Sequence, residues 1–155
     1  MIKIKEIIEK FEAIAGLHPN INYFGFGKIY DIPTNIKYPY LWVAGDERHR
    51  IEYSEDNGYR AVEYNFNIRI GDKINNQLNY PDGNRLDIIN NTFIYMMDII
   101  NTISNDSLNI FNDIELIDTI YVEPFYNEDQ HNVDGHSAIL TLRVKNDKSC
   151  LTPLN

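Results

Sequence analysis

The sequence predicts an α+β fold, in which a mostly antiparallel sheet carries an N-terminal helix and one long central helix packed on it. Three observations favour this class: a long alternating segment over residues 60–71, two segments with apolar residues at helical spacing, and an Asn-Gly turn between strand-like segments. Strands follow one another with no helix between most of them, which argues against the regular strand–helix alternation of a parallel sheet.

The chain has the size and composition of one globular domain. It contains 155 residues, of which 43% are hydrophobic, and it shows no internal repeat or low-complexity tract. A chain of this length can bury a core of its own. We therefore expect a single domain over residues 1–155, with a short extended C-terminal tail at 145–155.

The N-terminal part predicts one helix and two short strands. Apolar residues recur at helical spacing over residues 2–15, and Gly16 and Pro19 then end the helix. A strand weakened by two glycines is expected over residues 22–31, where the backbone comes close to another group. Residues 40–43 are compact and apolar, as in a buried strand.

The alternating segment predicts the main strand of the sheet. Its apolar side carries Val62, Tyr64, Phe66, Ile68 and Ile70, and its polar side carries Glu63, Asn65, Asn67 and Arg69. This period of two indicates one buried face and one wet face. Residues 51–54 form the other arm of a hairpin, because the turn at 55–58 contains Asn-Gly, a strong hairpin signal.

A second helix is expected over residues 84–103. One stripe, expected to face the core, contains Leu86, Ile89, Phe93, Met96, Ile100 and Ile103. A second stripe on nearly the opposite side contains Ile88, Tyr95 and Ile99. Together they span an apolar arc of roughly 200°, against about 100° for a simple surface helix. Such a helix needs cover on two sides, which the first helix or a neighbouring subunit could supply.

The C-terminal third predicts two further strands. Residues 114–125 have strand character and are expected to bend near Asp118. Residues 126–135 then form an acidic loop, and residues 138–144 alternate as the last strand.

Charge and composition exclude several classes of protein. The formal charge is −9, from 14 basic and 23 acidic residues, which argues against a gripped nucleic acid because phosphate binding needs clustered Lys and Arg. The single cysteine, Cys150, excludes an intrachain disulfide. The charged N-terminus does not resemble a signal peptide, and no apolar run reaches the roughly 18 residues of a membrane span. Synthesis inside the cell is therefore expected.

The candidate chemical groups favour structural interpretations. Asp129, His131, Asp134 and His136 could present metal ligands, but their spacing matches no tight motif and a solvated loop is favoured. The run at 46–50 holds acids, bases and His49 without a nucleophile, as in a charged loop tip. Cys150 has no histidine near it in sequence. We therefore predict no catalytic residue, no metal and no cofactor.

Three longer patterns together resemble a known family. They are H-P-N-I-N-Y-F-G-F-G-K-I-Y-D-I with K-Y-P-Y-L-W-V, then Y-N-F-N-I-R-I followed by the helix D-I-I-N-N-T-F-I-Y-M-M-D-I-I, and finally V-E-P-F-Y-N-E-D-Q-H-N-V-D-G-H-S-A-I-L-T-L-R-V with K-S-C-L-T-P. Their order along nearly the whole chain resembles the small neck and tail-completion (tail-terminator-like, head–tail connector) proteins of tailed phages, especially phages of gut Bacteroidetes.

The resemblance implies a structural protein of the virion, made in the host cytoplasm. Such proteins form hexameric or dodecameric rings between the portal and the tail, beside connector, portal or tail-tube proteins. DNA passes through the bore without specific binding. The family has no catalytic residue to carry over. Its C-terminal arms are long in some members, whereas only eleven residues follow Val144 here.

On this basis we expect particular residues to meet a neighbouring subunit or the bore. The expected interface contains Ile88, Tyr95, Ile99, Cys150 and Leu151, and the expected bore-facing or ring-facing loops contain Glu55, Asp56, Asn57, Glu128 and Asp129. The alternatives are a small α+β adaptor or binding domain acting as a monomer or dimer and, ranked last, a metal-dependent enzyme using residues 129–136.

Overall fold

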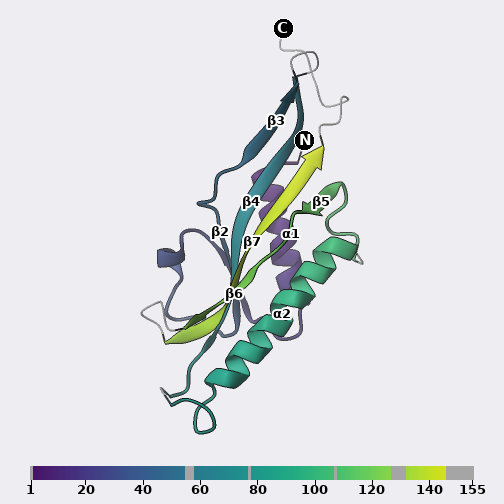
Figure 1. Cartoon of the computed structure of the whole chain (residues 1–155). Coiled ribbons are helices and arrows are strands. Elements are labelled where there is room, and N and C mark those ends of the chain that lie inside the picture. Colours follow the sequence, from purple (N-terminus) through teal and green to yellow (C-terminus); the bar gives the residue numbers. More distant parts are fainter. Residues whose placement is uncertain (1, 55–57, 77, 107, 127–131, 146–155) are drawn as a thin grey trace.

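The computed structural model describes residues 2–54, 58–76, 78–106, 108–126 and 132–145. Within them, two α-helices and a seven-stranded sheet confirm the predicted α+β class (Figure 1). The elements in chain order are α1 (Ile4–Leu17), β1 (Tyr23–Phe26), a 3-10 turn η1 (Ile29–Asp31), β2 (Tyr40–Ala44), β3 (Arg50–Ser54), β4 (Gly58–Lys73), α2 (Arg85–Asn105), β5 (Ile114–Ile117), β6 (Val122–Tyr126) and β7 (Val133–Lys145).

Two long antiparallel strands, β4 and β7, form the centre of the sheet. They pair continuously from Ala61 opposite Lys145 to Lys73 opposite Val133. Each side of this pair is completed by two shorter strands, β2 and β3 along β4, and β5 and β6 along β7. The pairing is antiparallel throughout, except that β1 runs parallel to β2 at the edge.

Both helices contribute to one core on one face of this sheet. The apolar side of β4 is buried there as predicted, because covering it removes a large apolar area from water. From α1, Phe11 meets the edge of the Phe66 ring at 6.0 Å and the Phe111 ring at 5.6 Å. From α2, Met96 and Ile99 enter the same cluster.

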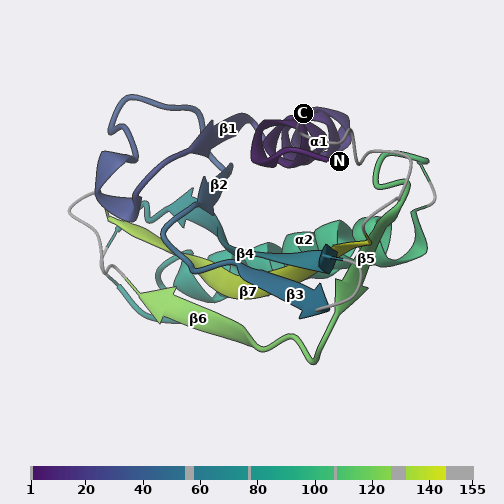
Figure 2. The same cartoon turned by 90° about the horizontal axis from the view of Figure 1, so that it is seen from above.

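The opposite face has a smaller cluster at one end and is open elsewhere. Its members come from β2, β6, β7 and the connection after η1, and are Ile32, Tyr40, Trp42, Ala44, Phe125 and Val133. Figure 2 shows that connection folded over β1 and β2 at the end of the molecule away from α1. The Trp42 ring lies so close to Gly25 that any side chain there would overlap it, which explains the predicted close backbone approach.

The C-terminal third differs from its prediction in two places. The expected strand over 114–125 is split into β5 and β6, because Asp118 adopts a left-handed conformation with φ of +67° and interrupts the extended chain. The expected loop over 126–135 is shorter than predicted, since Val133–Gly135 already belong to β7 and pair with β4.

The orientation of α2 corrects the predicted stripes. Its buried residues are Ile88, Thr92, Met96, Ile99 and Ile103. Ile88 and Ile99, expected on an outer interface, are only 3% and 0% exposed. Their assignment to an outer stripe is therefore wrong, and each contributes to the subunit's own interior.

A polar residue lies at the centre of the buried face, between the two predicted stripes. Thr92 is fully buried and bonds within the helix and to His136, so its polar group is satisfied on the side that faces the sheet. Leu86 and Phe93, expected in the core, are exposed. Tyr95 is half-buried, and its ring lies 5.2 Å from that of His18.

The remaining residues named for the interface and the bore lie outside the described residues. They are Glu55, Asp56, Asn57, Glu128, Asp129, Cys150 and Leu151. Their predicted roles stay predictions.

Candidate functional site

The outward face of α2 carries an apolar strip, called here the outer stripe: Leu86, Phe93, Ile94 and Met97. Leu86 is 52% exposed and the other three are each 40% exposed. With about 100° between successive residues, Leu86, Phe93 and Met97 fall within about 40° of one another around the helix. The Phe93 ring also lies 5.4 Å from that of His136, so this side chain is partly packed on the sheet. Apolar side chains gathered on one exposed helix face mark an interaction site more often than scattered single residues do.

The strand edges of the sheet are poorly suited to pairing with another chain. The edge strand β6 contains Pro124, which lacks an amide donor, and β3 is interrupted by a register shift between Glu52 and Tyr53. The other two edge strands, β1 and β5, have four residues each, so they offer few backbone groups for pairing with a strand of another chain. These are the usual devices that prevent edge-to-edge association, so the helix surface is the better candidate for contacts.

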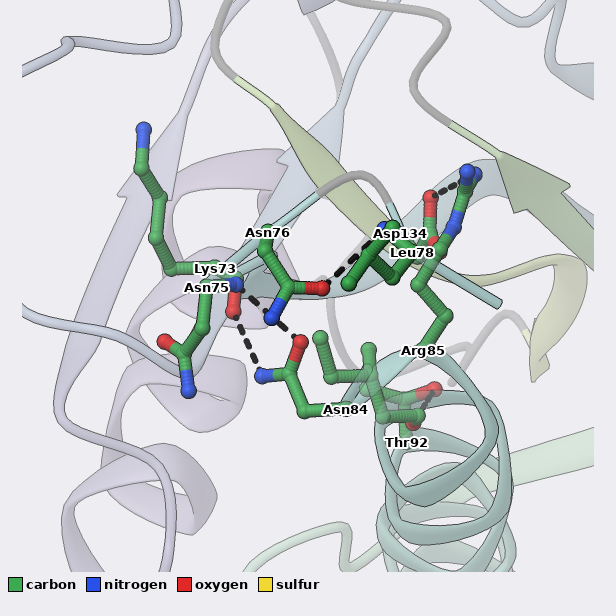
Figure 3. A network of polar contacts seen from close by, with 9 residues as sticks. Lys73, Asn75, Asn76, Leu78, Asn84, Arg85, Thr92 and Asp134 are labelled. Carbon is green, nitrogen blue, oxygen red and sulfur yellow. Dashed lines mark hydrogen bonds and ion pairs between the residues drawn. The ribbon is translucent and has the colours of Figure 1, made fainter. Parts of the chain in front are cut away.

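A buried ion pair anchors the start of α2 to the sheet (Figure 3). The Arg85 guanidinium donates from Nε and Nη2 to the two carboxylate oxygens of Asp134, at 2.8 and 3.1 Å. The Asp134 side chain is fully buried and that of Arg85 is 20% exposed. The hydrogen bond to Asp134 raises the pKa of Arg85 above its ordinary value. The first turn of α2 is thereby held on the first residues of β7.

Asn84, just before α2, ties the preceding connection to the same place. Its Oδ1 accepts from the backbone N–H of Asn75 at 3.0 Å, and its Nδ2 donates to the carbonyl of Lys73 at 3.3 Å (Figure 3). The Asn76 side chain accepts from the N–H of Leu78 at 3.0 Å. These bonds hold the connection between β4 and α2 on the helix, and Leu78 and Tyr80 in this connection are exposed.

A second polar contact lies about two helical turns further along α2, in the core. The Thr92 hydroxyl donates to the carbonyl of Ile88 at 2.7 Å and lies 3.0 Å from Nδ1 of His136. Since the hydroxyl hydrogen is directed to Ile88, we assign Nδ1–H as the donor to Thr92. Burial lowers the pKa of His136 below its ordinary value of 6.5. A neutral His136 therefore fits this position.

These contacts show the surroundings of two of the four candidate metal ligands. Asp134 and His136 face α2, where Arg85 and Thr92 bind them, while Asp129 and His131 lie outside the described residues. Within the described ranges, no three His, Cys, Asp or Glu side chains come together as a metal would require.

The depressed pKa of His136 gives a prediction about pH. The unfolded chain binds a proton at His136 near pH 6.5, whereas the folded chain binds it only at lower pH, so stability should decrease as the pH falls from about 7 through 6.5. Burial raises the pKa of Asp72, which acts at lower pH and with the opposite sign. Urea denaturation across this range should show a weaker pH dependence for His136→Gln, and equal slopes in both proteins would contradict the assignment.

The charged run at 46–50 serves as an anchor for the sheet. His49 Nδ1 accepts from the backbone N–H of Asn65 at 3.2 Å, and Asn65 Nδ2 donates to the carbonyl of Arg48 at 2.8 Å. Asn65 lies on β4 between the part paired with β2 and the part paired with β3. The run thus fills a gap in strand pairing.

Charged residues also cross the open face of the sheet in register. Arg50, Glu63, Arg143 and Glu115 stand opposite one another on β3, β4, β7 and β5. Arg143 Nη2 donates to Glu52 at 2.6 Å, and this bond lowers the pKa of Glu52. Such exposed pairs add little stability, but they keep this face polar.

A groove, called here the helix groove, lies between the end of α1 and the C-terminal half of α2. It has a volume of about 350 Å³, and its lining includes Leu17, His18, Asp98, Asn101, Asn105 and Leu108. His18 Nδ1 accepts from the N–H of Asn20 at 3.2 Å, so its Nε2–H donates to Asp98 at 3.2 Å. Both ring nitrogens are therefore occupied, which leaves His18 in a structural role.

In comparisons with known proteins, no family model and no curated protein matched this sequence. Among the described residues, neither helix is both long and apolar enough to cross a membrane. What the geometry defines is an α+β domain with a firmly anchored helix that presents apolar side chains outward.

Proposed function

We propose that this protein is a structural subunit that assembles with copies of itself into a ring at the head–tail junction of a tailed phage. The observation that carries the proposal is the outer stripe of α2. Four large apolar side chains are exposed there on a helix whose start is fixed by the Arg85–Asp134 pair. Covering them would remove apolar area from water at about 25 cal/mol per Å².

The position of the outer stripe favours a lasting contact between folded subunits. A rigid helix face loses little conformational freedom on binding, so more of the gain from apolar burial is kept. Because the edge strands carry Pro124 and the register shift in β3, sheet extension is a poor alternative.

The charge of the chain agrees with a ring through which DNA moves. The surplus of acidic residues gives a net charge of −9, which repels the phosphates of DNA and keeps the DNA from binding to the protein surface. The place of the ring in a virion rests on the resemblance of the three sequence patterns to neck and tail-completion proteins. An adaptor domain working as a monomer would need no exposed stripe for its own copies.

The experiment compares two substitutions on exposed positions of α2. Met97→Lys places a charge within the outer stripe, whereas Asn91→Lys adds the same charge to the polar side of the helix. We expect Met97→Lys to weaken self-association by at least about tenfold, because burying an unpaired ammonium is costly. Sedimentation velocity over a dilution series measures this change.

Asn91→Lys is the matched control and should sediment like the natural protein. Circular dichroism should show equal helix content in all three proteins, since both positions are exposed. If Met97→Lys associates as strongly as Asn91→Lys, the outer stripe is not the contact surface.

A further inference from the structure

We propose a specific contact for this assembly: the hairpin of β3 and β4 in one copy inserts Ile51 and Tyr53 into the helix groove of the next copy. The inference rests on the proposed function, and it names a second pair of surfaces that meet, in addition to the contact made by the outer stripe. The hairpin arm is defined here as Arg50–Ser54 of β3 with residues 58–62 of β4.

The hairpin arm extends the apolar face of the sheet beyond its helices. Figure 1 shows β3 and the start of β4 reaching past both helices at the upper end of the molecule. Ile51 stands opposite Val62, which belongs to the core face of β4. Nevertheless Ile51 and Tyr53 are 66% and 69% exposed, so neither helix covers this part of the face in the described part of the chain.

The helix groove offers a counterpart with a mixed lining, in which exposed leucines stand beside polar side chains. Leu17 on one side is 64% exposed and Leu108 on the other is 49% exposed, with Ile14 also contributing to the lining. A volume of about 350 Å³ is at the lower end of the range for small ligand pockets, so one or two large side chains can enter.

The charges around the two surfaces are complementary. Asp98 in the groove lining accepts from Nε2 of His18 at 3.2 Å, and its side chain is still 54% exposed. On the hairpin arm the Arg50 side chain is 67% exposed and only 3.7 Å from Glu63, a loose pair. Glu52, the acid between them in sequence, is bound by Arg143 at 2.6 Å. An arginine beside an apolar pair thus meets a groove with a carboxylate.

The two surfaces lie apart on the subunit, so the contact must join different copies. The hairpin arm is beyond the N-terminal end of α1, whereas the helix groove is at the C-terminal end of the same helix (Figure 1). Two different patches that bind each other form a head-to-tail contact, which closes into a ring when the rotation between copies allows it.

Cysteine pairs test the contact in the full chain. In a Cys150→Ser background, which removes the single natural cysteine, one protein carries Tyr53→Cys and another carries Asn101→Cys. Both positions are exposed, so folding should be preserved. On mild oxidation the mixture of the two should give a cross-linked dimer, while neither protein alone should give one.

The matched control replaces Tyr53→Cys with Tyr30→Cys, at a side chain that is 92% exposed on another part of the surface. Proximity in the assembly raises the effective concentration of the paired thiols, so we expect on the order of tenfold more dimer than with this control. Equal yields from the two mixtures, or a dimer formed by Asn101→Cys alone, would overturn the contact.

The same samples separate this inference from the proposed function. Oligomers in sedimentation without the expected cross-link would reject the hairpin contact and leave self-assembly in place. A monomer at every concentration, with no cross-link, would reject both.

Discussion

Replacing Phe11 with alanine should lower the free energy of unfolding by about 3–5 kcal/mol. The Phe11 side chain is fully buried and meets Phe66 of β4 and Phe111 of the connection after α2. Removing the ring opens a cavity where α1, the sheet and that connection join. Because a domain is stable by only about 5–15 kcal/mol, this loss should be visible directly in urea denaturation.

Glu12→Ala is the control for this change. Glu12 is the next residue of α1 and is exposed, so its replacement should change stability by less than about 0.5 kcal/mol. Phe11→Leu keeps most of the volume and should fall between the two. A loss below about 1 kcal/mol for Phe11→Ala would show that α1 is not held to the sheet by this contact.

Replacing Arg85 with methionine should also cost about 3–5 kcal/mol, because it leaves the Asp134 carboxylate fully buried without its guanidinium. The substitution should loosen the first turn of α2, which Arg85 fixes to β7. Hydrogen exchange of α2 amides, together with urea denaturation, would measure the global and the local effect.

The double variant Arg85→Met/Asp134→Leu identifies the cause. Replacing both charges with apolar side chains removes the buried carboxylate that has lost its guanidinium, so most of the lost stability should return. If the double variant is as unstable as Arg85→Met, the lost stability comes from packing of the arginine stem and not from the cost of burying the Asp134 charge without Arg85.

The sheet could be predicted in outline because strand signals are local. The alternation over residues 60–71 and the Asn57-Gly58 turn each depend on neighbouring residues, and β3, β4 and their pairing follow from them. A bend in one strand was expected near Asp118, where the left-handed conformation instead separates β5 from β6. The parallel pairing of β1 with β2 had no local signal.

The orientation of α2 could not be predicted from apolar periodicity alone. Thr92 is polar in type, so the buried face was divided between two predicted stripes, although the Thr92 hydroxyl is bonded in the core. In the same way, Asp134 and His136 were expected in a solvated loop. They lie instead on the face of β7 that is turned toward α2. Buried polar groups depend on partners distant in sequence, Arg85 and Thr92, which no local pattern reveals.

The surplus of apolar residues on α2 was nevertheless visible in the sequence. An arc of roughly twice the usual width requires cover on two sides, whichever side faces the sheet. The structure moves the uncovered part from Ile88 and Ile99 to Leu86, Phe93, Ile94 and Met97. We therefore propose that α2 meets another copy through the outer stripe and not through Ile88 and Ile99.

Native mass spectrometry of the natural chain is the sharpest test of self-assembly. If two different surfaces of each 18.1 kDa subunit bind each other, we expect one dominant closed species at a fixed multiple of that mass, unchanged over a dilution series. A single 18.1 kDa species at every concentration would show that the outer stripe and the hairpin arm do not join copies of this protein.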